Sequence, residues 1–235
     1  MAQRTEAVSR LRRVELELRP EGRFSLPMSD GYPVYGALLG VLASIDEAVS
    51  EGIHDSSLGS LHSSGLLGIF GESDRPYHKT VLPKQTYRLS LGIVDPDDRE
   101  VFQALVNAIV LEGDSLDLRE GVFRVEEFQS ENTTHEKLID RVGAVSNPSI
   151  EMTFRTCTCL EEADEVTTMF PYRRAVFRSL LGKWNRTAPA DLEFDLSDEE
   201  ILGSVIEKPD PRSYETHSVL TNRVKRDDGE NRNLF

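Results

Sequence analysis

The chain has 235 residues, of which 38% are hydrophobic and 29% charged, and its formal net charge is −14. This length accommodates one large domain or two of about 100 residues each, and the lack of an apolar run of about 18 residues argues against a membrane span. Two cysteines rule out a disulfide framework and suit a reducing compartment. No apolar signal-peptide core follows the basic N-terminal residues, so we expect a cytoplasmic protein.

The negative charge has two interpretations. An acidic chain normally avoids nucleic acids, because Lys and Arg supply the affinity for phosphate. The alternative is adaptation to high salt, where a dense acidic surface keeps proteins soluble. With six lysines against 21 arginines, the composition resembles that of proteins from salt-loving archaea. Under that interpretation the net charge does not exclude an RNA partner, and the local charge distribution becomes informative.

The first predicted elements alternate between strand and helix. Alternating apolar residues predict a strand at 11–19. A helix then begins at Ser29 or Asp30, carries Pro33 in its first turn and ends near Gly52. Composition predicts the following segments in chain order: a mobile loop at 55–64, a short strand at 65–71, a turn-rich connection at 72–85 and a strand at 86–94.

The next predicted elements are a second helix and a further strand. The sequence DPDD at 95–98 is a strong helix start, and the helix extends to about Leu111 with Gly113 as its end. A strand or a short hairpin follows at 116–128. The resulting β-α-β-β-α-β order predicts a ferredoxin-like module over residues 1–128, an arrangement that RNA-recognition modules also use.

A second unit is predicted to follow a linker at 129–148. Residues 149–235 contain the start of the same pattern without its second helix and last strand. The predicted elements are a strand at 149–160, a helix at 171–185 and strands at 201–209 and 215–226. The predicted fold class is therefore α+β, with tandem ferredoxin-like (RRM-like) modules of which the second is incomplete.

Positive charge gathers in one segment of the second unit. Residues 171–190 contain five basic residues and no acid, and the next ten contain six acids and no base. This pattern fits a solvated basic helix followed by an acidic loop, or a phosphate-facing patch beside an acidic surface.

Histidines are the candidate groups for proton transfer, because the pKa of histidine lies near neutrality. His54 follows the first helix at the start of a Ser/Gly-rich loop, and His62 lies eight residues later in that loop. The alternative for His54 is the solvated polar end of a buried helix. His217 shares a predicted strand face with Arg223 and Lys225, which suits either a phosphate backbone or an ordinary exposed strand.

Other chemistries find no support in the sequence. Cys157 and Cys159 lack the second Cys or His pair of a zinc site, and are better explained as two strand residues on one face. No glycine-rich phosphate loop is present. We therefore expect neither a metal nor a cofactor.

Three stretches of the chain resemble one protein family. They are VELEL followed by FSLPMSDGYPVYGALLGVL, the segment GIHDSS just past that helix, and FPYRRAVFRSLLGKWNR followed later by THSVLTNRVKR. They resemble, in turn, the first strand and helix, the catalytic-histidine region, and the second-domain helix and strand of one enzyme family. These are the CRISPR-associated endoribonucleases of the RAMP superfamily, which cut repeat transcripts into guide RNAs. The resemblance spans most of the chain.

The resemblance implies RNA cleavage in antiviral defence. In such enzymes the 2′-hydroxyl attacks the adjacent phosphate without a metal, leaving a 2′,3′-cyclic phosphate and a 5′-hydroxyl. The reaction needs a base, an acid and positive charge at the phosphate. His54 is then the general acid or base, and His62 the second proton carrier or the true one. The expected partners are CRISPR repeat RNA and other subunits of a CRISPR effector complex. The expected phosphate contacts are Arg173, Arg174, Arg178, Lys183, Arg223 and Lys225.

The chain also departs from the family. Members normally continue into a glycine-rich segment and a final β-α-β stretch, so the chain resembles a C-terminally short member. Some members carry a tyrosine within the first helix and a lysine after the histidine, whereas this helix offers Leu38 and Leu39, and residues 55–70 contain no lysine. These departures favour an alternative, a non-catalytic RNA-binding subunit of an effector complex. The net charge favours a third, a ferredoxin-like enzyme or scaffold unrelated to RNA.

Overall fold

A computed structural model describes residues 11–45, 47, 50–51, 61–94, 98–113, 115–146, 149–156, 158, 160–161, 167–168, 170–208, 210, 212, 222–225 and 231–234. Within these residues, no helix combines the length and the apolar character that a membrane span requires.

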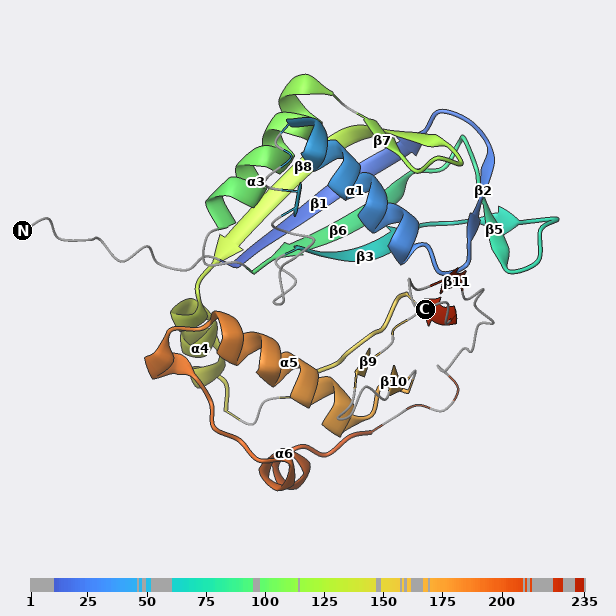
Figure 1. Ribbon diagram of the computed structural model, residues 1–235. Helices are drawn as coiled ribbons and strands as arrows, with labels where there is room; N and C mark the ends of the chain where they lie inside the picture. Colours follow the sequence, from blue (N-terminus) through green and yellow to red (C-terminus); the bar gives the residue numbers. More distant parts are fainter. Residues whose placement is uncertain are drawn as a thin grey trace, which may run out of the picture.

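A curled antiparallel sheet of five strands dominates the first half of the chain (Figure 1). Its strands are β1 (Leu11–Pro20), β3 (Leu61–Leu67), β6 (Tyr87–Ile93), β7 (Ser115–Asp117) and β8 (Val122–Thr133). They lie in the order β3-β6-β1-β8-β7, and each is antiparallel to its neighbours. Apart from the short β7, the large sheet and its helices follow the β-α-β-β-α-β order that the sequence predicted.

Two helices cover one face of this sheet (Figure 1). They are α1 (Gly31–Ile45) and α3 (Asp98–Val106). The chain continues from α3 as a single π-helical stretch, η1 (Asn107–Glu112), and leaves the helix at Gly113 as predicted. The predicted helix up to Leu111 is therefore present, but its last turns are wound as a π-helix.

Side-chain alternation explains how the sheet separates a buried face from an exposed one. In β1, Val14, Leu16 and Leu18 are buried beneath the helices, because successive strand residues point to opposite faces. Tyr87 and Leu89 of β6 join the same core. The opposite face is left to polar side chains, and it carries the candidate site.

The region 61–85 contains more strand than the sequence predicted. Residues 61–64, placed in a mobile loop, begin β3. The turn-rich connection contains β4 (Gly71–Glu72) and β5 (His78–Val81), which form a small sheet with β2 (Phe24–Pro27) in the order β2-β5-β4. The alternation was hidden because the register of β3 against β6 shifts between Ser63 and Leu66, and such a bulge breaks the period of two.

The predicted linker at 129–148 is ordered over much of its length. β8 continues to Thr133, and α4 (His135–Gly143) follows. Thr134 is the N-cap of α4, and its hydroxyl accepts a hydrogen bond from the backbone N–H of Lys137 at 3.4 Å. This Ser/Thr cap was the sequence signal for the helix.

The second half is mainly helical among the described residues. α5 (Arg173–Thr187) confirms the helix predicted at 171–185. The strand predicted at 201–209 is wrong in its first half, because α6 (Asp198–Ser204) forms there behind a capping box between Ser197 and Glu200. Residues 149–156 of the predicted strand 149–160 form no strand. The remaining elements are η3 (Ala190–Leu192), β9 (Leu160–Glu161), β10 (Thr167–Thr168), β11 (Asn222–Lys225) and β12 (Asn231–Leu234). The tandem arrangement of two modules stays a prediction.

Candidate nucleic-acid interface

The face of the sheet opposite α1 and α3 carries a connected row of polar groups. The Nε group of Arg13 donates to Glu15 at 2.8 Å, and the Ser90 hydroxyl donates to both oxygens of Glu15 at 2.7 and 2.8 Å. The backbone N–H of Ser90 donates to the Ser64 hydroxyl at 3.1 Å. Strands β1, β6 and β3 are thereby joined by side chains across their exposed face.

A groove of about 320 Å³ lies between this face and a segment made of residues 153–156 and Thr158. Its lining combines two guanidinium groups, several hydroxyl groups and one aromatic ring: Arg13, Arg155, Ser64, Ser90, Thr153, Thr156, Thr158, Phe154 and Leu67. Guanidinium and hydroxyl groups are the side chains that contact RNA phosphates and sugars. The groove is therefore a suitable surface for a nucleic-acid backbone.

His62 lies on the same exposed face, at the edge of the sheet. It pairs with Gly92 of β6, which in turn pairs with Arg13 of β1. Its Nε2 atom is buried and has no hydrogen-bond partner among the described residues. Burial, and then the positive charges of Lys183 and Arg186 on α5, lower the pKa of His62 to about 4. The imidazole is consequently neutral at pH 7.

Lys183 and Arg186 are one helical turn apart on α5, so they share a face of the helix. Both residues have exposed surface overall, whereas the Lys183 amine is partly desolvated. Neither forms an ion pair within the described part of the chain, and the Nε group of Arg186 donates to the carbonyl of Gly182 at 3.0 Å. Desolvation of its amine, and then the charge of Arg186, lower the pKa of Lys183. The charges of Lys183 and Arg186, which have no ion-pair partner among the described residues, thus act on the pKa of His62.

The predicted phosphate contacts at the start of α5 have carboxylate partners instead. Arg174 and Arg178 share Asp198, at 3.2 and 3.3 Å. Arg173 lies 3.8 Å from Glu207 and also donates to a backbone carbonyl at 2.7 Å. The reason is α6, which brings part of the acidic segment back against the basic helix. Phosphate contacts by these three arginines stay a prediction.

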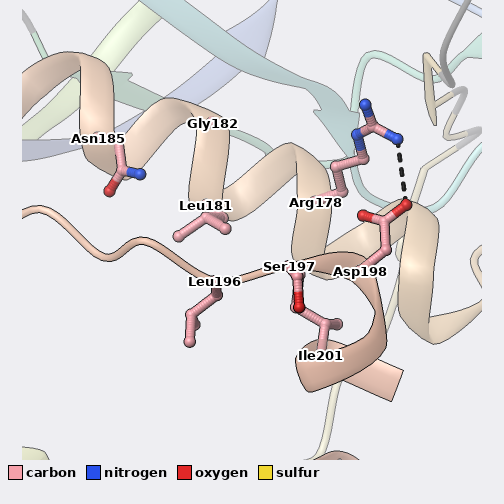
Figure 2. Close-up of a pocket in the computed structure, with 8 residues that line it drawn as sticks. All are labelled: Arg178, Leu181, Gly182, Asn185, Leu196, Ser197, Asp198 and Ile201. Atoms are coloured by element: carbon pink, nitrogen blue, oxygen red, sulfur yellow. Dashed lines mark hydrogen bonds and ion pairs between the residues drawn. The ribbon is translucent and has the colours of Figure 1, made fainter. Parts of the chain in front are cut away.

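A cavity of about 430 Å³ lies between α5 and α6, next to Asp198. Figure 2 shows the residues that line it. Leu181, Leu196 and Ile201 make its apolar lining, and the Arg178–Asp198 ion pair lies at one end. Its charged groups are already paired with each other, so this cavity offers no evident chemistry for RNA.

The other predicted site residues can be placed only in part. His54 and His217 lie outside the described residues. Arg223 and Lys225 lie in β11, which pairs with β12 as an antiparallel hairpin. Among the predicted residues, Arg174 and Arg178 meet at Asp198, and the charge of Lys183 acts on the pKa of His62.

Sequence reasoning missed a buried ion pair between Asp30 and Lys79. Their Oδ2 and Nζ atoms are 2.9 Å apart, and the Asp30 carboxylate also accepts hydrogen bonds from the backbone N–H of Leu66 at 3.4 Å. Burial raises the pKa of Asp30, and Lys79 opposes that shift. Lys79 further lies 4.0 Å from the centre of the Phe70 ring. This pair ties the start of α1 to β3 and β5, and so fixes the strand that carries His62.

A buried histidine of α4 fixes the other side of the site. His135 of α4 is buried, and its Nε2 atom lies 3.2 Å from the Thr187 hydroxyl of α5. Its ring meets Trp184 edge-on at 4.7 Å, and the Trp184 indole N–H donates to the Leu192 carbonyl at 2.8 Å. Burial lowers the pKa of His135, which keeps it neutral at pH 7. Trp184 and His135 thus hold the end of α5 that presents Lys183.

A metal centre is not evident at this site. Among the described residues, no group of three or more His, Cys, Asp or Glu side chains is arranged to hold a metal ion.

Comparison with known proteins gives a match in structure. No protein-family model matches the sequence, and no curated protein is similar to it in sequence. A Cas6 product complex superposes with a TM-score of 0.52 at 20% identity, covering 83% of this chain and 70% of that chain. A Cas6-related protein of Pyrococcus furiosus gives 0.50 at 12% identity, covering 77% and 73%. Thermus thermophilus Cas6 gives 0.48 at 20% identity, covering 78% and 64%.

The chain has a Cas6-like fold. A match over 83% of the chain necessarily extends past residue 128, so the Cas6-like fold includes part of the second half as well as the large sheet. The segments that form the site, β3 on one side and α5 on the other, come from these two halves.

Proposed function

We propose that this chain is a CRISPR repeat endoribonuclease that cleaves repeat transcripts into guide RNAs without a metal ion. The observation that carries the proposal is the Cas6-like fold, and it is supported by His62, on whose pKa the positive charges of Lys183 and Arg186 act. A proton-transfer group beside two cations that have no described carboxylate partner supplies what phosphodiester cleavage requires.

The proposed reaction is an internal transfer at phosphorus. A base removes the proton of the ribose 2′-hydroxyl, and the 2′-oxygen forms a bond to the adjacent phosphorus. The bond from phosphorus to the 5′-oxygen breaks, and an acid gives that oxygen a proton. The products are a 2′,3′-cyclic phosphate and a 5′-hydroxyl. Lys183 and Arg186 would stabilise the additional negative charge on the phosphorane oxygens.

The proton carriers are assigned from two sources. His54 is proposed as the general acid or base because of the family resemblance of its segment. His62 is proposed as the second proton carrier or the true one, supported by the action of the two positive charges on its pKa. Fixed charge and a histidine each contribute a factor of about 10² or more in such reactions, so each variant should be clearly impaired.

The test is a cleavage assay with labelled CRISPR repeat RNA from the host, in EDTA, at both about 0.1 M and about 1 M KCl, because salt screens contacts to phosphate. Wild type is compared with His54→Ala, His62→Ala and, as a matched control on an exposed face of α4, Lys137→Met. We expect cleavage at one site in EDTA, with a cyclic phosphate at the new 3′ end, reduced in both histidine variants and unchanged in the control. Cleavage that requires a divalent cation would contradict the proposal.

A second candidate function is an RNA-binding subunit that does not cleave. It is favoured by the buried Nε2 atom of His62 and by the absence of lysine from residues 55–70. Tight and specific binding of repeat RNA without any cleavage, by wild type and by both histidine variants alike, would favour this candidate over the enzyme.

A further inference from the structure

The α5–α6 cavity, the space between these two helices, is largely apolar and lies on the side of α5 that faces away from the large sheet (Figures 1 and 2). On α5 it is lined by Arg178, Leu181, Gly182 and Asn185. Their spacing of three and four residues places them on one face of the helix. The opposite wall consists of the connecting segment 193–197, which joins η3 to α6, and of α6 itself.

Hydrogen bonds hold the connecting segment in place against α5. The Asn185 side chain accepts a hydrogen bond from the backbone N–H of Phe194 at 3.0 Å and donates one to the carbonyl of the same residue at 2.7 Å. The ring of Phe194 also lies 5.6 Å from that of Trp184. A capping box between Ser197 and Glu200 fixes the start of α6. Because the wall is fixed at both ends, the cavity is preformed.

Apolar side chains at this cavity remain in contact with water. Phe194 and Leu196 of the connecting segment are 44% and 46% exposed, and Leu181 is half-buried. Burying such side chains against a partner is favourable. None of the described elements that line the cavity is a strand, so a partner cannot add a strand there. An amphipathic helix fits instead, because it places one apolar face in a hydrophobic groove.

The residues that flank the lining of this wall are acidic. Glu193 and Asp195 of the connecting segment and Glu199 of α6 are exposed, and they have no ion-pair partner in the described part of the chain. Asp198 differs, because it is paired with two arginines of α5. Uncompensated negative charge repels RNA phosphates, and it repels a second copy of a chain whose net charge is −14. It favours a partner with Lys or Arg beside its apolar face.

We infer that the α5–α6 cavity is a docking site for a second protein, which binds through an amphipathic helix with basic flanks. The apolar side chains of that helix enter the cavity beside Leu181, Leu196 and Ile201. Its Lys or Arg side chains lie opposite Glu193 and Asp195. The site shares no residue with the groove and the histidines proposed for RNA, so the inference holds whether or not the chain cleaves RNA. One helix buries a small interface, which predicts a Kd in the micromolar range.

The experiment uses the full chain and a synthetic helical peptide as the probe. The peptide has about 18 residues, enough for about five helical turns, with leucines at i, i+3, i+4 and i+7 and lysines on both sides of them. Two matched peptides replace every leucine with serine, or every lysine with glutamate. Fluorescence anisotropy measures binding in about 0.15 M KCl. We expect the leucine–lysine peptide to bind at least about tenfold more tightly than either matched peptide.

The decisive variant is Gly182→Leu, which fills the cavity from its α5 wall. A Cβ atom added at Gly182 meets nothing within 4 Å, and leucine forms helices better than glycine. The variant should therefore be at least as stable as wild type in urea unfolding, while it weakens peptide binding at least about tenfold. Gly36→Leu is the matched control on α1, where an added Cβ atom also meets nothing within 4 Å. It should bind the peptide as wild type does.

A second pair of variants tests the acidic flank. Glu193→Gln/Asp195→Asn should weaken binding of the leucine–lysine peptide about threefold or more in about 0.15 M KCl, and less in about 1 M KCl, because salt screens exposed charges. Asp140→Asn/Glu151→Gln removes the same net charge from exposed positions outside the cavity. This control should leave binding nearly unchanged.

Four results would each overturn the inference. Equal peptide binding by wild type and Gly182→Leu would place the peptide elsewhere, and equal binding of the serine peptide would reduce the effect to charge. A Gly182→Leu variant that is less stable than Gly36→Leu would show that the chain itself already fills the cavity. Self-association of wild type in sedimentation experiments, abolished by Gly182→Leu, would make a second copy the occupant.

Discussion

Two clusters of charged side chains in this protein differ in one respect, the presence of a counter-ion. In the first, Asp30 and Lys79 are both largely buried, lie 2.9 Å apart and have further partners. In the second, the charges of Lys183 and Arg186 act on the pKa of His62, and the His62 Nε2 atom is buried without a described acceptor. The first cluster has its counter-ion within the chain. In the proposed function, the negative charge that faces the second cluster comes from the RNA phosphate.

The difference separates stability from binding. A buried ion pair that loses one member leaves an uncompensated charge in the protein interior, which is strongly destabilising. Cations that already lack a partner cost little to remove, and their removal relieves repulsion. Substitutions in the first cluster should therefore change the free energy of unfolding, and substitutions in the second should change RNA affinity.

The largest effect is expected for Lys79→Met. It leaves the Asp30 carboxylate buried without its cation, and should lower the free energy of unfolding by about 3–5 kcal/mol. Urea unfolding at pH 7 measures the loss. In the double variant Asp30→Asn/Lys79→Met both charges are gone, and part of the stability should return. A loss below about 1 kcal/mol in Lys79→Met, as for a surface pair, would show that the ion pair is solvated.

The same contrast explains what the sequence could and could not predict. The large sheet, α1, α3 and α5 follow from local periodicity, caps and breakers, which act within a few residues. Asp30 was identified only as a helix cap, because its partner Lys79 is 49 residues away and becomes adjacent through the pairing of β2 with β5. Long-range pairing of this kind leaves no periodic signal.

The candidate site shows the same limit. Lys183 was recognised as basic and His62 as a loop histidine, but nothing in the local sequence relates a strand of the first half to a helix of the second. For Arg174 and Arg178 the sequence did not indicate a carboxylate partner, because charge along the chain does not reveal that α6 returns Asp198 to the same helix face. In both cases the surroundings of the side chain depend on a residue that is distant in the sequence or on another element.

Gly65→Ala tests the first cluster from its backbone side, and its expected effect is the next largest. Gly65 has φ +69°, and a Cβ atom there would lie 2.6 Å from Oδ1 of Asp30. Left-handed backbone at a residue other than glycine costs about 1–3 kcal/mol, and the clash disturbs the carboxylate as well. Thermal and urea unfolding should show a loss in this range or above it. Gly36→Ala is the control, because its added Cβ meets nothing within 4 Å. Equal stability of the two variants would contradict the close approach.

His62→Gln tests the second cluster through acid stability. In the unfolded chain the pKa of histidine is about 6.5, whereas in the folded protein the pKa of His62 is about 4. Between these values the unfolded state binds more protons, so the free energy of unfolding falls as the pH falls from about 6.5 towards 4. Glutamine does not titrate, so the variant should lose less stability between pH 7 and pH 4.5 in urea unfolding. His135, whose pKa burial also lowers, is present in both proteins and contributes equally. Parallel pH profiles would show that the His62 ring is solvated.

The smallest effects are expected at the other end of α5, where the cations are paired. Arg178→Gln removes one surface ion pair, 3.3 Å long, and should change the free energy of unfolding by no more than about 1 kcal/mol. If Arg178 contacts phosphate, it must first exchange Asp198 for the RNA, so its variant should weaken RNA binding less than Lys183→Met. The slope of log Kd against log salt concentration measures the difference, since each lost phosphate contact lowers its magnitude by about 0.7 for single-stranded RNA. Asp198→Asn completes the comparison. If it strengthens RNA binding and raises the salt dependence, the carboxylate was holding these arginines away from phosphate, and the two ends of α5 differ only in the presence of that counter-ion.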